Sequence, residues 1–337
     1  MILLTGVTGY LGSQIAQQLI ARRIPFRVLV RDPRRLVFDA ASCGCELVAG
    51  DLLDPAARRA ALQNVEAVIH TAALVKMWVR DRRDFWRVNV EALRVLLHDA
   101  AAANVRRIVY TSSFMALGPS ADVNADERLR NAGPFANKYE ETKAQALAWL
   151  RSEGFKRYPV VVLVPGVIYG PGPATEGNLV GGMINQYLAG KFPGILGSGR
   201  QRWSFAYNAD VVNAHLAALE KGKPGEVYLL AGDNRSLNDF FQLLGEYSQV
   251  RRPLRHLPFV LGKIVGAMEV TRARCFGHSP QITPGVVEIF QHDWVYSSSK
   301  AIQELSYQVT PLEEGLRETL KARDTGTQGT GHGDTSR

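Results

Sequence analysis

The sequence predicts an α/β protein with a doubly wound parallel sheet and a smaller, mostly helical substrate lobe in its C-terminal half. Short apolar segments alternate with helical patterns along the N-terminal half, which is typical of parallel strands joined by helices. The segment 159–164 is apolar throughout, as expected for a strand covered on both faces. With 337 residues, of which 46% are hydrophobic and 21% charged, the chain is long enough for one or two domains.

The first turn carries three glycines, Gly6, Gly9 and Gly12, between an apolar strand and a helical pattern that includes Ile15 and Leu19. Such a turn gathers backbone N–H groups and the positive end of a helix dipole, which together bind a pyrophosphate. Gly6 permits the sharp turn, Gly9 lets the backbone approach the phosphates, and Gly12 lets helix and strand pack closely. The G-x-x-G-x-x-G spacing is one residue longer than the usual dinucleotide fingerprint, so this stretch alone is also compatible with an ordinary strand–helix connection.

The other elements follow in order along the chain. Asp54 and Pro55 are typical of a helix start, and Asp210 is placed to cap a helix that runs to Leu219. The later strands are expected at 26–30, 46–51, 67–70, 107–111, 159–164, 202–206 and 226–230, and helices through 90–97, at 137–152 and at 179–188, with 235–320 mostly helical.

Composition changes after Pro165, where glycine and proline become frequent, and the C-terminal tail is poor in apolar residues. We therefore expect a dinucleotide-binding Rossmann domain at 1–171 plus about 201–232. A substrate-binding lobe is expected at 172–200 plus 233–322, and a disordered tail at 323–337.

Charge and cysteine content narrow the functional classes. A net charge of +8 is compatible with binding to nucleic acid, to an acidic membrane surface or to an anionic cofactor. However, aromatic residues are not interleaved with the arginines, as stacking on nucleic-acid bases would require. We therefore expect no nucleic-acid partner. No apolar run is long enough for a transmembrane segment, and the first strand leaves no room for a signal peptide. Three cysteines without metal-like spacing favour a reduced, cytoplasmic compartment and no metal site.

The sharpest chemical pattern is Tyr139 followed by Lys143, because residues four apart share one helical face. A nearby ammonium favours the phenolate, so such a tyrosine can exchange a proton with a substrate oxygen. This pattern is common at protein surfaces. It gains weight because Ser112 and Ser113 close the strand 107–111, and ligands of open α/β sheets collect at the carboxyl ends of strands. His70 and His215 are expected to be structural.

Taken together, these motifs resemble those of the extended short-chain dehydrogenases/reductases, which include nucleotide-sugar epimerases and dihydroflavonol reductases. The stretches that carry the resemblance are 5–12, 50–52, 70–73, 88–90, 110–113, 139–143 and 165–171. Within the family, the stretches 70–78, 110–118 and 197–205 look closest to plant-type farnesol dehydrogenases, with hopanoid-associated sugar epimerase-like proteins as near competitors.

The resemblance implies roles for the matching residues. Tyr139 would be the acid/base, Lys143 would lower its pKa and hold the nicotinamide ribose, Ser113 beside Ser112 would bind the substrate oxygen, and Asn89 would support the proton relay. The glycine turn and the resemblance together give the cofactor-binding set as Gly6, Gly9, Tyr10, Leu11, Gly12, Arg31, Asp51, Leu52, Thr71, Ala72, Ala73, Lys143, Pro165, Gly166 and Val167.

The residue after the second strand bears on the choice of dinucleotide. NAD enzymes usually place an acidic residue there for the ribose 2′-OH, whereas an arginine accommodates the 2′-phosphate of NADP. This chain has Arg31, with Arg34 and Arg35 just beyond, which slightly favours NADP. Plant farnesol dehydrogenases use NAD with an arginine at this place, and Asp32 could serve the hydroxyl, so NAD is the alternative.

The resemblance implies an NAD(P)-dependent alcohol dehydrogenase or carbonyl reductase that acts on a lipophilic, farnesol-like substrate. Five apolar residues near the strand ends support an apolar pocket, unless they are simply core: Met77, Trp78, Phe114, Met115 and Leu117. The apolar span 257–268 in the second lobe adds to this pocket. The alternatives are a nucleotide-sugar epimerase or dehydratase, and a non-catalytic dinucleotide-sensing protein. The segment 207–210 differs from the His-x-Asp-Asp motif that many relatives carry at this place. A homodimer is a separate hypothesis.

Overall fold

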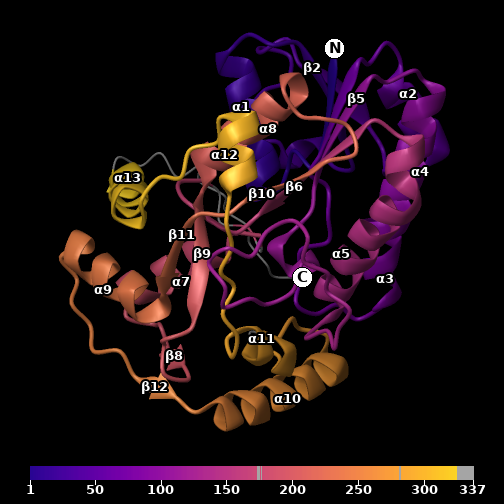
Figure 1. The fold of residues 1–337 in the computed structure, drawn as a ribbon. Helices are drawn as coiled ribbons and strands as arrows, with labels where there is room; N and C mark the ends of the chain where they lie inside the picture. The colour runs from indigo at the N-terminus through magenta and orange to yellow at the C-terminus, as the bar shows by residue number, and fades with distance from the viewer. Residues whose placement is uncertain (173–174, 176, 281, 325–337) are drawn as a thin grey trace.

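Seven parallel strands form the central sheet of the computed structural model, which describes residues 1–172, 175, 177–280 and 282–324 (Figure 1). The strands are β1 (Ile2–Thr5), β2 (Phe26–Val30), β3 (Glu46–Ala49), β4 (Ala67–His70), β5 (Arg107–Thr111), β6 (Val160–Pro165) and β10 (Val227–Leu230). Their order across the sheet is β10-β6-β5-β4-β1-β2-β3. The predicted parallel α/β fold is confirmed.

The strand order reverses between β1 and β4, which creates the crevice where open α/β sheets bind ligands. The register brings the carboxyl ends together there, since Thr5 pairs with His70 and His70 pairs with Tyr110. Every residue of β6 is buried, in agreement with a strand covered on both faces.

Helices cover both faces of the sheet (Figure 1). One face packs against α1 (Tyr10–Ala21), α8 (Asn208–Glu220) and α12 (Ser299–Leu305). The other packs against α2 (Pro55–Leu62), α4 (Ala92–Ala102) and α5 (Lys138–Trp149). Shorter pieces of helix extend these elements: η1 (Pro33–Arg35), α3 (Arg83–Trp86), η2 (Arg87–Glu91), η3 (Phe114–Ala116), η4 (Leu150–Gly154) and α6 (Phe155–Arg157).

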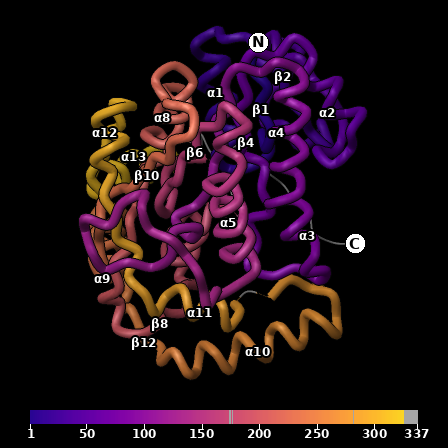
Figure 2. Tube along the Cα trace, turned by 45° about the vertical axis from the view of Figure 1, so that its right-hand side comes forward, coloured from indigo at the N-terminus to yellow at the C-terminus, as the bar shows by residue number. Residues whose placement is uncertain are grey.

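The C-terminal region is mostly helical, as predicted, and carries two small sheets. Its helices are α7 (Leu179–Leu188), α9 (Leu237–Ser248), α10 (Phe259–Phe276), α11 (Pro284–Ile289) and α13 (Leu312–Asp324). The small sheets contain β7 (Val167–Tyr169), β9 (Arg202–Tyr207) and β11 (Asp233–Ser236), and β8 (Ile195–Leu196) with β12 (His256–Leu257). Figure 2 shows α10 along one edge of the molecule, with α11 on its inner side.

Two local expectations need correction. Asp210 does not cap α8: the N-cap residue is Tyr207, without a side-chain cap, and the Asp210 carboxylate instead accepts a hydrogen bond from the Thr310 N–H at 2.8 Å. Strand β11 was not expected, and it pairs antiparallel with β9. The predicted boundary near residue 232 therefore crosses a small sheet, and the division into two domains stays a prediction. Of the tail expected to be disordered, residues 325–337 lie outside the described residues.

Candidate active site

The glycine turn after β1 is tightly packed on one side and open on the other. Gly6 has φ +80°, and a Cβ there would lie 2.5 Å from the Ala72 nitrogen. A Cβ on Gly12 would lie 2.2 Å from the Gly6 carbonyl oxygen and 2.8 Å from the Thr71 hydroxyl. At Gly9, by contrast, the nearest non-adjacent described atom would be the Gly6 oxygen at 3.2 Å. The turn thus keeps an open, side-chain-free approach at the start of α1, which fits a dinucleotide pyrophosphate.

The segment after β7 lies against this turn. Tyr10 is buried, and its hydroxyl donates to the Gly170 carbonyl at 2.9 Å. Gly172 has φ +141°, and a Cβ there would lie 2.7 Å from the Tyr10 ring. The Asn208 amide donates to the Pro171 carbonyl at 2.5 Å. The Tyr10 side chain therefore holds segment 170–172 over α1, and Leu11 beside it is half-buried.

The predicted catalytic residues meet at the carboxyl end of β5. Ser113 begins η3 and accepts a hydrogen bond from the Met115 N–H at 3.3 Å. Tyr139 lies in the first turn of α5, which Asn137 caps through the Glu140 N–H at 2.9 Å. Ser113 and Tyr139 are both buried, and the serine hydroxyl lies close enough to the phenol to lower its pKa. The structure thus brings together the serine and tyrosine that sequence reasoning paired.

Lys143 is buried and held at the end of β5. Its Nζ donates to the Thr111 carbonyl at 3.0 Å and to the Tyr110 hydroxyl at 3.3 Å, and lies 5.0 Å from the centroid of the Tyr110 ring. Burial lowers the pKa of Lys143 to about 7 and raises that of Tyr139 to about 12. The Lys143 ammonium faces the end of β5, and its expected effect on the pKa of Tyr139 stays a prediction.

Asn89 occupies a π-helical turn, η2, directly before α4. Its side-chain oxygen accepts from the Leu74 N–H at 2.7 Å, and its amide donates to the Thr142 hydroxyl at 3.1 Å. Asn89 therefore links the segment after β4 to the helix that carries Tyr139, and π-helical turns are often found at functional sites. Thr142 was not predicted, although it lies between Tyr139 and Lys143 in the sequence.

Two buried histidines support the strand ends. His215 Nδ1 contacts the Val211 carbonyl at 2.7 Å, so this nitrogen carries the hydrogen and Nε2 accepts from the Thr111 hydroxyl at 2.8 Å. His70 Nδ1 lies 2.7 Å from the Thr5 hydroxyl, and its ring stacks on Tyr110 at 5.6 Å. Burial lowers the pKa of His215 to about 4, and burial with the charge of Lys143 lowers that of His70 to about 3. Both act as neutral braces, which agrees with the structural roles expected for them.

The groups predicted to bind the adenosine half lie at the ends of β2 and β3. Arg31 is exposed and has no ion pair within the described part of the chain. Asp32 is held by Arg34, whose Nε lies 2.8 Å from its carboxylate, and this hydrogen bond lowers the pKa of Asp32. Asp51 is exposed and accepts from the Leu53 N–H at 2.8 Å. Half-buried Leu52 is fixed through its carbonyl, which accepts from buried Arg58 at 2.8 Å.

The remaining predicted residues lie at neighbouring strand ends. Thr71 donates to the Thr5 carbonyl at 2.8 Å, while Ala72 and Ala73 are half-buried beside the glycine turn. Pro165, Gly166 and Val167 are buried where β6 leads into β7, and a Cβ on Gly166 would lie 2.5 Å from the Ser204 carbonyl oxygen. All these residues therefore lie along the carboxyl edge of the sheet or on the turns that follow it.

The apolar residues divide into two groups. Met115 and Leu117 are buried in the main core, which agrees with the alternative that these residues are simply core. Met77, Trp78 and Phe114 are half-buried, and the Phe114 ring packs edge-on against Trp294 at 5.1 Å. All three keep part of their surface exposed, while Met77 and Phe114 also pack against the main core.

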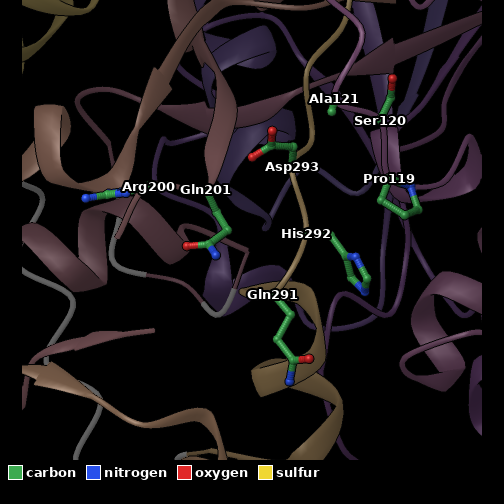
Figure 3. A pocket seen from close by; sticks show the side chains of 8 residues that line it. All are labelled: Pro119, Ser120, Ala121, Arg200, Gln201, Gln291, His292 and Asp293. Carbon is green, nitrogen blue, oxygen red and sulfur yellow. The ribbon is translucent and has the colours of Figure 1, made fainter. Parts of the chain in front are cut away.

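A surface pocket of about 530 Å³ lies elsewhere (Figure 3). Its walls are Pro119, Ser120, Ala121, Arg200, Gln201, Gln291, His292 and Asp293. The Asp293 carboxylate accepts hydrogen bonds from the Arg202 guanidinium at 3.0 Å and from the Arg202 backbone N–H at 2.7 Å. Asp293 therefore joins β9 to the segment before Trp294. None of the predicted site residues lines this pocket. The Ser120 hydroxyl accepts from the Asp122 N–H at 3.1 Å, whereas the buried Gln201 Oε1 has no hydrogen-bond partner among the described residues.

Comparison with known proteins agrees with this geometry. Residues 2–231 match the NAD dependent epimerase/dehydratase family. The sterol demethylase protein B of Methylococcus capsulatus is 33% identical over 76% of this chain and 77% of that protein. A putative dihydroflavonol 4-reductase of Synechocystis is 26% identical over 94% of this chain and 92% of that protein. The 4-hydroxy-2-methyl-3-oxo-4-farnesyl-3,4-dihydroquinoline-1-oxide ketoreductase of Stigmatella aurantiaca is 29% identical over 76% of this chain and 75% of that protein.

Solved structures share the whole fold. The crystal structure of gox2253 has a TM-score of 0.77 and 31% identity, and the match covers 97% of this chain and 99% of that one. UDP-glucuronic acid 4-epimerase from Bacillus cereus, solved with NAD and a UDP-sugar, has a TM-score of 0.73 at 20% identity, over 96% of this chain and 99% of that one. At that identity the likeness shows the fold alone. The glycine turn, the strand-end serine and the tyrosine–lysine helix thus occur in a chain that belongs to the NAD-dependent epimerase/dehydratase family, the extended short-chain dehydrogenases/reductases.

Proposed function

We propose that this protein interconverts a lipophilic alcohol and its carbonyl compound with NAD(P), through Ser113, Tyr139 and Lys143. The observation that carries the proposal is the buried Tyr139 phenol beside Ser113, at the carboxyl end of β5 and next to an open glycine turn. A protein that only senses a dinucleotide would not need this arrangement.

In the proposed reaction the bound nicotinamide dinucleotide supplies or accepts the hydride. Ser113 binds the substrate oxygen, and Tyr139 donates a proton to it during carbonyl reduction. A phenol whose pKa is about 12 is protonated at neutral pH, which suits the acid role. Alcohol oxidation needs the phenolate, so its rate should rise with pH. Lys143 holds the Thr111 carbonyl and stands ready for the nicotinamide ribose.

Three lines support a lipophilic, isoprenoid-type substrate. Met77, Trp78 and Phe114 leave apolar surface half-exposed near the strand ends. Relatives of comparable identity are named for a farnesyl-bearing quinoline oxide and for sterol demethylation. The stretches 70–78 and 110–118 resemble farnesol dehydrogenases. The alternative is a nucleotide-sugar epimerase or dehydratase, which fits the fold of the UDP-sugar enzyme but needs polar groups for a diphosphate.

The deciding experiment is a turnover screen of farnesol, flavonoid ketones and UDP-sugars with NAD and NADP. We expect dinucleotide-dependent turnover of farnesol or its aldehyde, which disappears in Tyr139→Phe. Tight binding of a UDP-sugar with no turnover of long-chain alcohols would overturn the substrate assignment. Dinucleotide binding with no turnover of any compound, unchanged by Tyr139→Phe, would favour the sensing role.

We propose a slight preference for NADP. Arg31 is exposed and unpaired among the described residues, whereas Asp32 is engaged by Arg34, so the guanidinium is freer than the carboxylate to meet the ribose substituent. The counter-argument is that the compared UDP-sugar enzyme was solved with NAD. Arg31→Ala should raise the KM for NADP and leave the KM for NAD little changed. Equal effects on both, or a wild-type preference for NAD, would show that Arg31 has another role.

The domain division also remains part of the proposal. Residues 1–171 with about 201–232 would hold the dinucleotide, and 172–200 with 233–322 would hold the substrate. A homodimer stays a prediction, which sedimentation of the full chain can test.

A further inference from the structure

Helix α10 exposes its large apolar side chains and buries its small ones. Five large apolar residues follow the i, i+1, i+4, i+5, i+8 spacing of one helical face: Val260, Leu261, Ile264, Val265 and Met268. All five are exposed, with Val260 70% and Met268 61% accessible, and Phe276 at the end of the helix is 80% accessible. Scattered exposed apolar residues are ordinary, but a contiguous stripe of this kind marks an interaction surface.

The opposite face explains why the helix is held in this orientation. Gly262, Gly266 and Ala273 are the buried residues of α10. A Cβ on Gly262 would lie 2.8 Å from Leu196 and 3.2 Å from Val287, and one on Gly266 would lie 2.8 Å from the backbone of Thr283. The helix therefore sits close against α11 through small residues, and its large residues stay between 42% and 70% exposed on the other face.

The surroundings of the stripe are basic. The segment 251–278 contains six Lys and Arg residues and one acidic residue, Glu269. Lys263 pairs with Glu288 at 2.8 Å and Arg272 pairs with Glu269 at 3.0 Å. The other arginines, Arg251, Arg252, Arg255 and Arg274, are exposed. This segment therefore supplies a net charge of +5 to a chain whose total is +8.

We propose that α10 and the basic segment leading into it dock on an anionic lipid surface. An apolar stripe flanked by Lys and Arg is the pattern of a helix that lies in the membrane interface, with its apolar face in the acyl boundary and its basic groups near the headgroups. No helix within the described ranges is long and apolar enough to cross a membrane, so this contact would be peripheral. Figures 1 and 2 both show α10 along the outer edge, where a flat surface can reach it.

A second copy of the chain is the other occupant to weigh. In a two-fold contact the same patch meets itself, so both basic segments would come together and repel. The charge balance therefore favours an anionic surface over a second copy. The proposal does not depend on the reaction assigned above, because it rests on α10 and the basic segment that leads into it.

The test is co-sedimentation of the full chain with vesicles of phosphatidylcholine alone and of phosphatidylcholine with an equal part of phosphatidylglycerol. We expect binding to the mixed vesicles, weaker binding to the neutral ones, and release as salt is raised. The variant Val260→Ser/Ile264→Ser/Met268→Ser should bind the mixed vesicles about tenfold or more weakly, since membrane affinity scales with buried apolar area. A matched control, Val37→Ser/Val123→Ser/Ile302→Ser, changes three other exposed apolar residues and should bind as wild type.

Three outcomes would overturn the proposal. The wild-type chain fails to bind the mixed vesicles, or it binds both kinds equally at every salt concentration, or both triple variants bind alike. A lipid-free dimer that only the α10 variant dissociates would assign the face to a second copy instead. Thermal unfolding of each variant checks that it is folded, and the salt dependence of the wild type tests the charge argument without any variant.

Discussion

The carboxyl edge of the central sheet and helix α10 break the usual rule of burial in opposite directions. At the sheet edge, His70, Asn89 and Lys143 are no more than 2% exposed, although polar side chains are mostly found at the surface. On α10, Val260 and Met268 are more than half exposed, although such side chains are mostly found inside.

The two regions tolerate these exceptions for different reasons. His70, Asn89 and Lys143 each have a partner, namely Thr5, Thr142 and the Thr111 carbonyl, so the cost of leaving these three groups unsatisfied is avoided. The Ser112 hydroxyl is the exception at this edge, because it is buried without a hydrogen-bond partner among the described residues. Helix α10 needs no such partners, because its small residues hold it against α11. The comparison teaches that substitutions should be severe at the first region and nearly silent for folding at the second.

The largest effect is expected from Tyr139→Phe. It removes the transferable proton and leaves packing nearly intact, so kcat should fall about 10²–10⁴-fold. The matched control is Tyr307→Phe, which removes a hydroxyl that is also buried but has no hydrogen-bond partner among the described residues. Steady-state kinetics with bound dinucleotide measures both. Near wild-type turnover in Tyr139→Phe would remove this residue from the mechanism.

The glycine turn gives the next effect. Gly12→Ala places a Cβ 2.2 Å from the Gly6 oxygen, so the turn must shift, which should cost about 1–3 kcal/mol of unfolding free energy and weaken dinucleotide binding. Gly182→Ala, also within a helix, meets no described atom within 4 Å and should stabilise by about 0.5–1 kcal/mol. Urea unfolding and dinucleotide titration test the pair. Equal behaviour of the two variants would contradict the packed turn.

Acid should weaken the sheet edge through its histidines. The folded pKa values of His215 and His70, about 4 and about 3, lie below the ordinary 6.5, so the unfolded chain binds more protons in this range. Their contribution is fully present above pH 6.5 and is lost as the pH falls toward the folded values. His215→Gln should make the slope of unfolding free energy against pH shallower by about 1 kcal/mol per pH unit between pH 6 and 5. An unchanged slope would show that His215 titrates elsewhere.

The smallest effect is expected on α10. Ile264→Ser replaces a side chain that is 54% exposed and should change the unfolding free energy by no more than about 0.5 kcal/mol. Ile15→Ser, at a fully buried position of helix α1, should cost several times more, at least about 2 kcal/mol. Chemical unfolding of the two variants compares them directly. A large loss in Ile264→Ser would mean that the α10 stripe belongs to the core.

Much of this protein follows from local sequence patterns. The alternation of apolar strands and helices predicts the parallel sheet, because period and length are properties of short segments. The three glycines predict the open turn after β1, since only glycine leaves such an approach free of side chains. The four-residue spacing of Tyr139 and Lys143 predicts one helical face. Ser113 lies beside Tyr139 because helix α5, which follows β5 in the chain, begins at the carboxyl edge of the sheet where β5 ends.

The tertiary structure decided what local spacing cannot express. Lys143 faces Tyr110 and Thr111, residues of β5 more than thirty positions earlier, and Asp210 binds the Thr310 N–H a hundred residues later instead of capping its own helix. The orientation of α10 is of the same kind. One face of α10 carries large apolar residues and the other carries small ones, so neither is marked as polar by the sequence. Only the fit of Gly262 and Gly266 against β8 and α11 determines which face is buried and which meets the solvent.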